Sequence, residues 1–123
     1  MNLQLTGKTA LITGGSKGIG RAIAERLAEE GCSLHLASRT ETDLTRARNE
    51  LNEKYGAQVI IHAADLSNGD RMRQPAADTA GIDILINNAG AIPAGGVEAI
   101  DEATWREAWD LKVFGYINLA REV

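Results

Sequence analysis

Glycines are concentrated in one short segment, residues 13–20, which reads Thr-Gly-Gly-Ser-Lys-Gly-Ile-Gly. The segment lies between an apolar run and a helical pattern, the place where parallel α/β proteins bind nucleotide phosphates. Gly14 allows a sharp exit from a strand, Gly18 lets the backbone approach a pyrophosphate, and Gly20 lets the helix pack close to the sheet. The spacing Gly-x3-Gly-x-Gly is not that of a P-loop, which ends in Gly-Lys-Ser or Gly-Lys-Thr. Taken alone, the segment is also compatible with an ordinary strand-to-helix turn.

Ser38 and Arg39 follow the second apolar run, where a dinucleotide site distinguishes NAD from NADP. A site for NAD usually has an acid there to bind the ribose 2′-hydroxyl, but here the nearest acid is Glu41. Arg39 and Lys17 of the glycine segment would instead pair with a 2′-phosphate. We therefore predict that NADPH is preferred over NADH. The alternative is that both residues are solvated surface cations.

Two further segments stand at the ends of the third and fourth apolar runs. The carboxylate of Asp65 can accept a hydrogen bond from the adenine amine while Leu66 packs on the ring, although Asp65 could equally cap the next helix. Residues 87–90, Asn-Asn-Ala-Gly, are small enough for the backbone to pass under a cofactor, and their amides can hold neighbouring strand ends. Because open α/β sheets bind ligands at the carboxyl ends of their strands, all four segments should meet at one edge.

The elements that position these segments alternate along the chain. Apolar runs predict strands at residues 8–13, 33–37, 58–63 and 82–86. The third run is nearly all apolar, so we expect a strand that is covered on both faces. Helical patterns between the strands predict a Rossmann-type, three-layer α/β/α fold in a single domain, residues 1–123.

The helices have recognisable ends. Patterns at residues 18–30 and 42–55 are closed by Gly31 and Gly56. A weaker pattern at 68–79 should be kinked or shortened by Pro75. Asp101 should cap a last helix that carries two tryptophans and runs unbroken to the final residue.

Composition excludes several functional classes. The chain has 123 residues, 44% hydrophobic and 24% charged, with a net charge of −4, so we expect one globular domain that does not bind nucleic acid. Its apolar runs are too short for a membrane span, and without a leader pattern we predict a cytoplasmic protein. Cys32 is the only cysteine and should be a small buried residue. His35 and His62 lie inside strands without metal-ligand spacing, so we expect structural roles and no metal.

Taken together, the segments at 13–20, 65–66 and 87–90 resemble the short-chain dehydrogenase/reductase family over essentially the whole chain. The resemblance implies a partial doubly wound sheet in the order 3-2-1-4, an NAD(P) cofactor, and hydride transfer between the nicotinamide and a carbonyl or alcohol. It also implies that Asn87 supports the sheet. The cofactor-binding residues that it implies are Gly14, Ser16, Lys17, Gly18, Ile19, Gly20, Ser38, Arg39, Asp65, Leu66, Asn88, Ala89 and Gly90.

The chain departs from this family in two places. Members use a serine and a Tyr-x3-Lys motif for catalysis, and neither Tyr55 nor Tyr116 begins such a motif. We therefore expect a chain truncated before its catalytic segment, with no catalytic residue and no activity of its own. Members also have an asparagine three residues before a helix glycine. With Gly115 as that glycine, Lys112 takes the asparagine position, either as a substitute in proton relay or as a plain surface lysine.

Two rival functions remain from the residues alone. One is a non-catalytic nucleotide-binding or interaction module. The other, a methyltransferase, is disfavoured because S-adenosylmethionine carries no phosphate for Arg39 to bind. In the order 3-2-1-4 the fourth strand is left with an open edge, so we expect a homo-oligomer or pairing with the missing C-terminal half.

Overall fold

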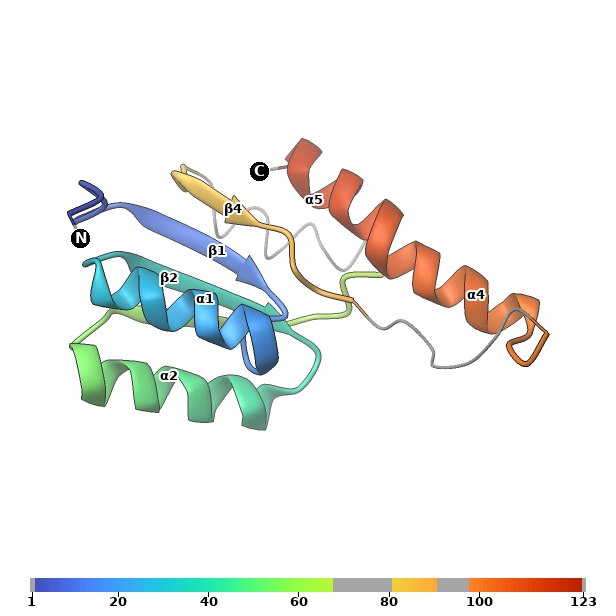
Figure 1. The fold of residues 1–123 in the computed structure, drawn as a ribbon, viewed down its shortest axis with the longest axis horizontal. Helices are drawn as coiled ribbons and strands as arrows, with labels where there is room; N and C mark the ends of the chain where they lie inside the picture. The colour runs from blue at the N-terminus through green and yellow to red at the C-terminus, as the bar shows by residue number, and fades with distance from the viewer. Residues whose placement is uncertain (1, 68–80, 91–97, 123) are drawn as a thin grey trace.

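A computed structural model describes residues 2–67, 81–90 and 98–122 of the chain. Its centre is a parallel sheet of four strands in the order β3-β2-β1-β4 (Figure 1). The strands are β1 (Thr9–Thr13), β2 (Ser33–Ser38), β3 (Val59–Ala63) and β4 (Ile84–Ile86). The predicted fold class and strand order are confirmed.

One face of the sheet packs against two helices, α1 (Gly18–Glu29) and α2 (Glu41–Tyr55). In the register of β1 with β2, Ala10 pairs with Leu34 and Ile12 with Leu36, and all four are almost fully buried. They form one core with apolar residues of both helices. The alternation of side chains along each strand explains why only every second residue belongs to this core.

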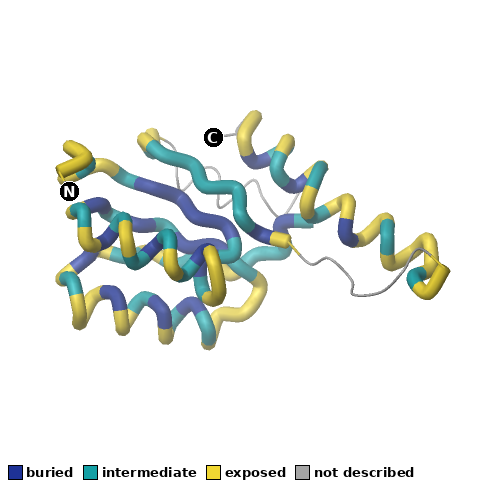
Figure 2. Tube along the Cα trace, viewed as in Figure 1, coloured by how far each residue is buried: buried dark blue, intermediate teal, exposed yellow. Residues whose placement is uncertain are grey.

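The opposite face has its own, smaller core. Leu11 and Ala37 point to this side and pack with Leu66, Ala89 and Leu119. Figure 2 shows β1 and β2 buried along most of their length, whereas β4 is only partly covered. The central strands are therefore sandwiched between layers, as the three-layer prediction requires.

Glycines end α1 and α2 in the left-handed conformation. Gly31 has a φ of 88°, and its N–H donates to the carbonyl of Ala28 at 3.0 Å. Gly56 has a φ of 65°, and its N–H donates to Asn52 at 2.8 Å. These bonds satisfy carbonyls that the helix leaves free, so both helices end close to the predicted residues.

The last helical region differs from the prediction of one unbroken helix. Asp101 caps its start as predicted, since its Oδ1 accepts a hydrogen bond from the Thr104 N–H at 2.8 Å. The chain then forms α4 (Glu102–Trp109), a π-helical segment η1 (Asp110–Gly115) and α5 (Tyr116–Glu122). The π-helical segment ends where Gly115 touches the backbone of Leu66: a Cβ there would lie 2.7 Å from the Leu66 carbonyl oxygen. The change from α-helix to π-helix thus occurs beside a contact with a distant segment of the chain. Hydrophobic periodicity along the helix gives no information about such a contact.

The prediction that the third strand is covered on both faces is wrong. Val59 and Ile61 pack into the core against α1 and α2, but Ile60 is 46% exposed and Ala63 is also exposed. Among the described strands, β3 pairs only with β2 and stands at an edge. The weaker helix predicted at 68–79 lies outside the described residues. Within the described part of the chain, no helix combines the length and apolarity that a membrane span requires.

Cys32 and the two histidines occupy structural positions. Cys32 is 3% exposed, its thiol lies 3.5 Å from the Leu5 carbonyl, and burial raises the pKa of that thiol. Nδ1 of His35 and Nε2 of His62 lie 2.9 Å apart, with their rings nearly parallel. The two side chains share one face of neighbouring strands β2 and β3. The sequence treated each histidine as solitary, whereas the sheet pairs them.

Glu25 links α1 to the end of α2. Its Oε1 accepts a hydrogen bond from the Tyr55 hydroxyl at 2.6 Å and pairs with the Lys54 ammonium at 2.8 Å. Arg21 approaches the other carboxylate oxygen at 3.8 Å. The hydrogen bond from Lys54, that from Tyr55, and the charge of Lys54 lower the pKa of Glu25 from 4.5 to about 2. Three groups on two helices therefore favour the ionised carboxylate.

We predict a pH-dependent role for Glu25 in stability. Its pKa is lower in the folded chain, so the carboxylate contributes fully above pH 4.5 and loses this contribution as the pH falls towards 2. Glu25→Gln should therefore lower the free energy of unfolding at neutral pH, and its difference from the parent chain should close near the bottom of this range. Urea unfolding across the range measures the difference. Glu29→Gln, which removes a more exposed carboxylate paired with Arg26, is the control, and an equal pH dependence in both variants would contradict the prediction.

Candidate functional site

A groove of about 320 Å³ runs along the carboxyl ends of the strands. Its size is at the lower end of the range usual for small-molecule sites. Segments from all four predicted sites line it. The lining residues are Gly14, Ser16, Lys17, Ser38, Arg39, Thr40, Asp43, Ala64, Leu66, Asn88, Ala89, Gly90 and Leu111.

The glycine segment bends between β1 and α1 in the way that its sequence predicts. Gly14 has a φ of 66° and Gly18 a φ of 57°, values that favour glycine. A Cβ at Gly20 would overlap the carbonyl oxygen of Gly14 and lie 2.6 Å from Nδ2 of Asn88. A Cβ at Gly18 would meet nothing within 4 Å. Gly20 is therefore needed for packing, and Gly18 leaves open space beside the start of α1.

The start of α1 has backbone donors available for a ligand. Lys17 is the N-cap residue, in an extended conformation, and its side chain makes no capping hydrogen bond. The first N–H groups of a helix have no partner within the helix and carry the positive end of its dipole. An anion at this end of α1 would therefore be stabilised.

The buried hydroxyl of Thr13 joins the glycine segment to the segment after β4. It accepts hydrogen bonds from the N–H groups of Asn88 and Ala89, both at 3.0 Å, and lies 3.4 Å from the Ile86 carbonyl oxygen, to which it donates. Nδ2 of Asn88 lies 3.3 Å from the carbonyl oxygens of both Thr13 and Gly14. The predicted role of the amides in fixing strand ends is therefore visible for Asn88. Sequence reasoning did not single out Thr13, which reads only as the last residue of a strand.

The two predicted cations both line the groove but differ in their surroundings. Lys17 is 73% exposed, and its ammonium pairs with the Asp43 carboxylate at 3.0 Å. Arg39 is exposed and forms no hydrogen bond or ion pair with the described residues. The hydroxyls of Ser16 and Ser38 lie 3.4 Å apart and link the glycine segment to the end of β2. The sequence placed these four residues together correctly but missed Asp43.

Asp65 and Leu66 separate in the structure. Leu66 is 5% exposed and lines the groove. Oδ1 of Asp65 accepts hydrogen bonds from the N–H and the hydroxyl of Ser67, at 3.0 and 2.6 Å. This turn resembles the start of a helix cap, the alternative interpretation, but the residues that would continue the helix lie outside the described part. Four of the predicted cofactor-binding residues do not line the groove, although their neighbours in sequence do: Gly18, Ile19, Gly20 and Asp65. The side chain of Ile19 is largely exposed.

Lys112 lies beside Gly90, at the end of the groove formed by the segment after β4. A Cβ on Gly90 would meet Cδ and Nζ of Lys112 at 3.3 and 3.4 Å. The Lys112 ammonium donates to the Tyr116 hydroxyl at 3.2 Å, and Nδ2 of Asn87 lies 3.5 Å from the Tyr116 carbonyl oxygen. Lys112 belongs to the π-helical segment, a feature frequently found at functional sites. Lys112 is therefore adjacent to a groove residue without lining the groove itself. The Asn87 side chain reaches α5, so its role in supporting the sheet stays a prediction.

Comparison with known proteins identifies the same fold and family. A family model described as short chain dehydrogenase matches residues 8–123. The uncharacterized oxidoreductase YvaG of Bacillus subtilis is 33% identical over 122 residues, which is 98% of this chain and 46% of that protein. L-sorbose reductase from Gluconobacter frateurii, solved with NADPH and L-sorbose, superposes with a TM-score of 0.90 at 35% identity, covering 100% of this chain and 48% of that one.

An alcohol dehydrogenase from the archaeon Thermococcus sibiricus, solved with 5-hydroxy-NADP, superposes with a TM-score of 0.88 at 28% identity. The match covers 94% of this chain and 51% of the archaeal one. The chain therefore spans about half the length of these relatives.

We predict that the Thr13 hydroxyl is required for the geometry of the site. Thr13→Val keeps the side-chain shape but leaves the N–H groups of Asn88 and Ala89 without their acceptor. We expect it to lower the free energy of unfolding by about 1–3 kcal/mol, measured by urea denaturation. Thr9→Val, at the opposite end of the same strand, is the matched control because the hydrogen bond from the Thr9 N–H to Asp83 does not involve its side chain. Equal stabilities of the two variants would show that these bonds matter little.

Proposed function

This chain belongs to the short-chain dehydrogenase family, an oxidoreductase family, and we propose that it forms the NADP(H)-binding part of such an enzyme. The supporting observation is the groove at the carboxyl ends of the strands, where a glycine segment, a helix N-terminus and two cations meet. NADPH is also the cofactor in the related L-sorbose reductase structure. When bound, the nicotinamide supplies or accepts the hydride; the chain's own residues bind and orient it.

The pyrophosphate would lie at the start of α1. The open space beside Gly18 leaves room for the phosphates, and the free N–H groups of the first turn can donate to them. Gly14 and Gly20 act indirectly, because their close contact with the segment after β4 holds this turn in place. The absence of side chains at these glycines therefore serves both the fit of the ligand and the packing of the loop.

The adenosine half would lie over the ends of β2 and β3. Arg39, exposed and unpaired within the described part of the chain, would bind the 2′-phosphate, helped by Lys17 and Ser38. Leu66, buried in the groove wall, would pack on the adenine ring. A hydrogen bond from the adenine amine to Asp65 stays a prediction, because its Oδ1 holds the turn at Ser67.

The nicotinamide half would lie along Asn88, Ala89 and Gly90, towards Lys112. Lys112 is exposed, but its ammonium lies close to Gly90 and donates to the Tyr116 hydroxyl, a position compatible with a role in proton transfer. This role remains a proposal. The serine and Tyr-x3-Lys groups implied by the family resemblance do not occur in these 123 residues.

We propose that the reaction of the complete enzyme is reversible hydride transfer with a carbonyl or alcohol substrate. A longer polypeptide carrying the catalytic groups would perform it, and this chain would supply the dinucleotide platform. The rival interpretation, a nucleotide-binding module without chemistry, is not favoured by membership of an oxidoreductase family. The cytoplasmic location stays a prediction.

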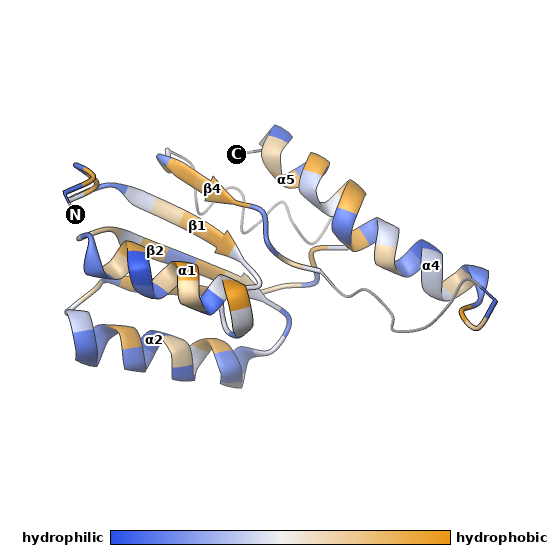
Figure 3. Cartoon of the chain, in the orientation of Figure 1, coloured by the Kyte–Doolittle hydropathy of each residue, from blue (hydrophilic) through white to orange (hydrophobic). Residues whose placement is uncertain are grey.

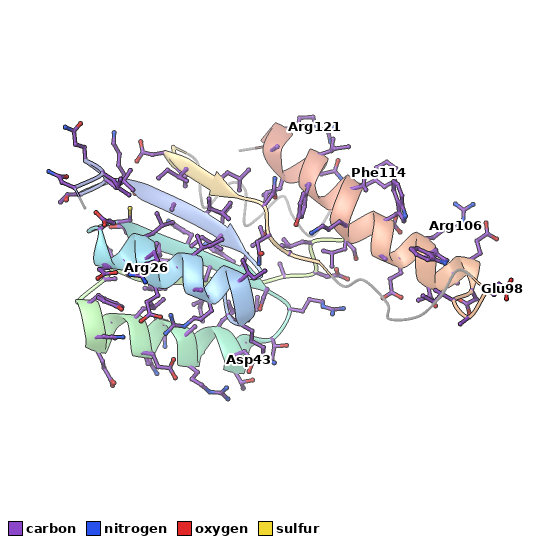
Figure 4. The ribbon with its side chains drawn as sticks, viewed as in Figure 1. Arg26, Asp43, Glu98, Arg106, Phe114 and Arg121 are labelled. Carbon is purple, nitrogen blue, oxygen red and sulfur yellow. The ribbon has the colours of Figure 1, made fainter. Side chains whose placement is uncertain are left out.

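We expect the chain to bind NADPH more tightly than NADH, and Arg39→Asp to reverse that order. Each charge-assisted contact with the 2′-phosphate should contribute about 1.5–3 kcal/mol, roughly 10- to 100-fold in affinity. Isothermal titration calorimetry with both cofactors measures the ratio. Arg106→Asp makes the same charge change on α4 (Figure 4), at a residue that does not line the groove, and should leave the ratio unchanged. Equal affinity of the unsubstituted chain for both cofactors would overturn the NADP(H) assignment.

The open side of β4 supports a further proposal, that a second copy or the rest of a longer polypeptide covers it. Among the described strands β4 pairs only with β1, and Figure 3 shows that it is strongly hydrophobic. Apolar side chains of the last helical region are also exposed: Trp109 is 55% exposed, and Phe114 and Ile117 are each 54% exposed. An unpaired apolar edge favours association.

We therefore predict that the chain self-associates. Sedimentation equilibrium at increasing protein concentration should give a mass that rises above 13.1 kDa, the mass of one chain. The separate substitution Trp109→Glu should shift this curve to higher concentration by removing part of the exposed apolar surface. A well-dispersed monomer at all concentrations would show that the edge argument is wrong.

A further inference from the structure

Asp43 lines the groove and pairs with Lys17, one of the two cations that the proposed function uses. Its Oδ2 pairs with the Lys17 ammonium at 3.0 Å, and its Oδ1 lies 3.7 Å from a guanidinium nitrogen of Arg46. Its side chain is 15% exposed, far less than that of either partner. Figure 4 places Asp43 at the start of α2, at the end of the sheet where the strands point. The carboxylate is thus a fixed, shielded negative charge in the groove wall.

The ion pair between Lys17 and Asp43 uses a cation that a 2′-phosphate would also bind. Lys17 is 73% exposed, so its long side chain is held mainly by Asp43 and can exchange one anionic partner for another. Arg39, by contrast, has no partner within the described residues. A 2′-phosphate entering this part of the groove would meet one available cation and one that is already neutralised.

We propose that Asp43 is a specificity-determining residue, which competes with the 2′-phosphate for Lys17 and so limits the preference for NADP(H) over NAD(H). The inference rests on the proposed function, since it presumes that the adenosine half binds here. A phosphate monoester carries a charge of about −1.5 to −2 at neutral pH, and it approaches a carboxylate that water screens poorly. A ribose 2′-hydroxyl is neutral and leaves the ion pair intact. Asp43 therefore opposes one cofactor and not the other.

The sequence position of Asp43 fits this role. The usual acid of an NAD site stands at the end of the second strand, where this chain has Arg39. Asp43 lies one helical turn further, in the first turn of α2, yet the fold brings its side chain to the same part of the groove. This chain therefore has its acid not at the end of β2, where it would contact the ribose, but in α2, where it acts on the ligand through Lys17.

The test uses two small nucleotides that differ by the 2′-phosphate, adenosine 2′,5′-bisphosphate and 5′-AMP, titrated calorimetrically into the 123-residue chain. Asp43→Asn preserves the side-chain shape and removes the charge. We expect binding of the bisphosphate to tighten about three- to tenfold, since exposed ion pairs are individually weak, while binding of 5′-AMP stays the same. In a Lys17→Met background the gain should shrink, because the competition runs through Lys17. Asp43→Ser gives a second measurement that does not depend on the amide of asparagine.

Glu50→Gln is the matched control, because it removes one negative charge from the same helix at a position that pairs with Arg21 outside the groove. Weaker or unchanged bisphosphate binding by Asp43→Asn, or an equal gain in Glu50→Gln, would overturn the inference. Weaker binding would mean that the carboxylate mainly positions Lys17 for the phosphate. If the unsubstituted chain bound neither nucleotide, the proposed function itself would be wrong. If it bound both but Asp43→Asn gave no selective gain, only the inference about Asp43 would be wrong.

Discussion

The hydrogen bonds of the Thr13 hydroxyl are the interaction on which the rest of the site depends. This buried group stands between the ends of β1 and β4 and accepts from two consecutive N–H groups, those of Asn88 and Ala89. The Asn88 side chain extends the connection to the carbonyls of Thr13 and Gly14. Because a buried N–H without an acceptor is costly, the two segments are held in one relative position. These two segments contribute Gly14, Asn88 and Ala89 to the lining of the groove, so the hydrogen bonds of Thr13 hold that part of the groove in shape.

The electrostatics of the groove combine with this geometry. The chain as a whole is acidic, with a net charge of −4, yet the wall near the end of β2 carries two cations and one carboxylate. One cation is held by the carboxylate, and the other is unpaired within the described residues. The scaffold thus offers a localised positive site against a negative background, which suits an anionic ligand that binds in one defined place.

One prediction from local pattern was wrong, and two further features were not foreseen, for a common reason. Residues 58–63 are as apolar as a central strand, but β3 lies at the edge and exposes Ile60. The last helical pattern is continuous in sequence, but a π-helical segment forms where Gly115 meets Leu66. His35 and His62 are solitary in sequence but adjacent in the sheet. In each case the outcome depends on which element lies alongside, and hydrophobic periodicity does not contain that information.

Local sequence was enough to predict the order of the elements, the turns at Gly14, Gly31 and Gly56, the Asp101 cap, and the segments that gather at one edge of the sheet. These features depend on backbone conformation and side-chain alternation over a few neighbouring residues. Contacts between distant parts of the chain make Thr13 the acceptor for residues 75 and 76 positions away and pair Asp43 with Lys17. Such contacts require the register of β1 against β4 and the placement of α2 beside the glycine segment. Those arrangements arise from packing of the whole sheet, so no short stretch of the chain could reveal them.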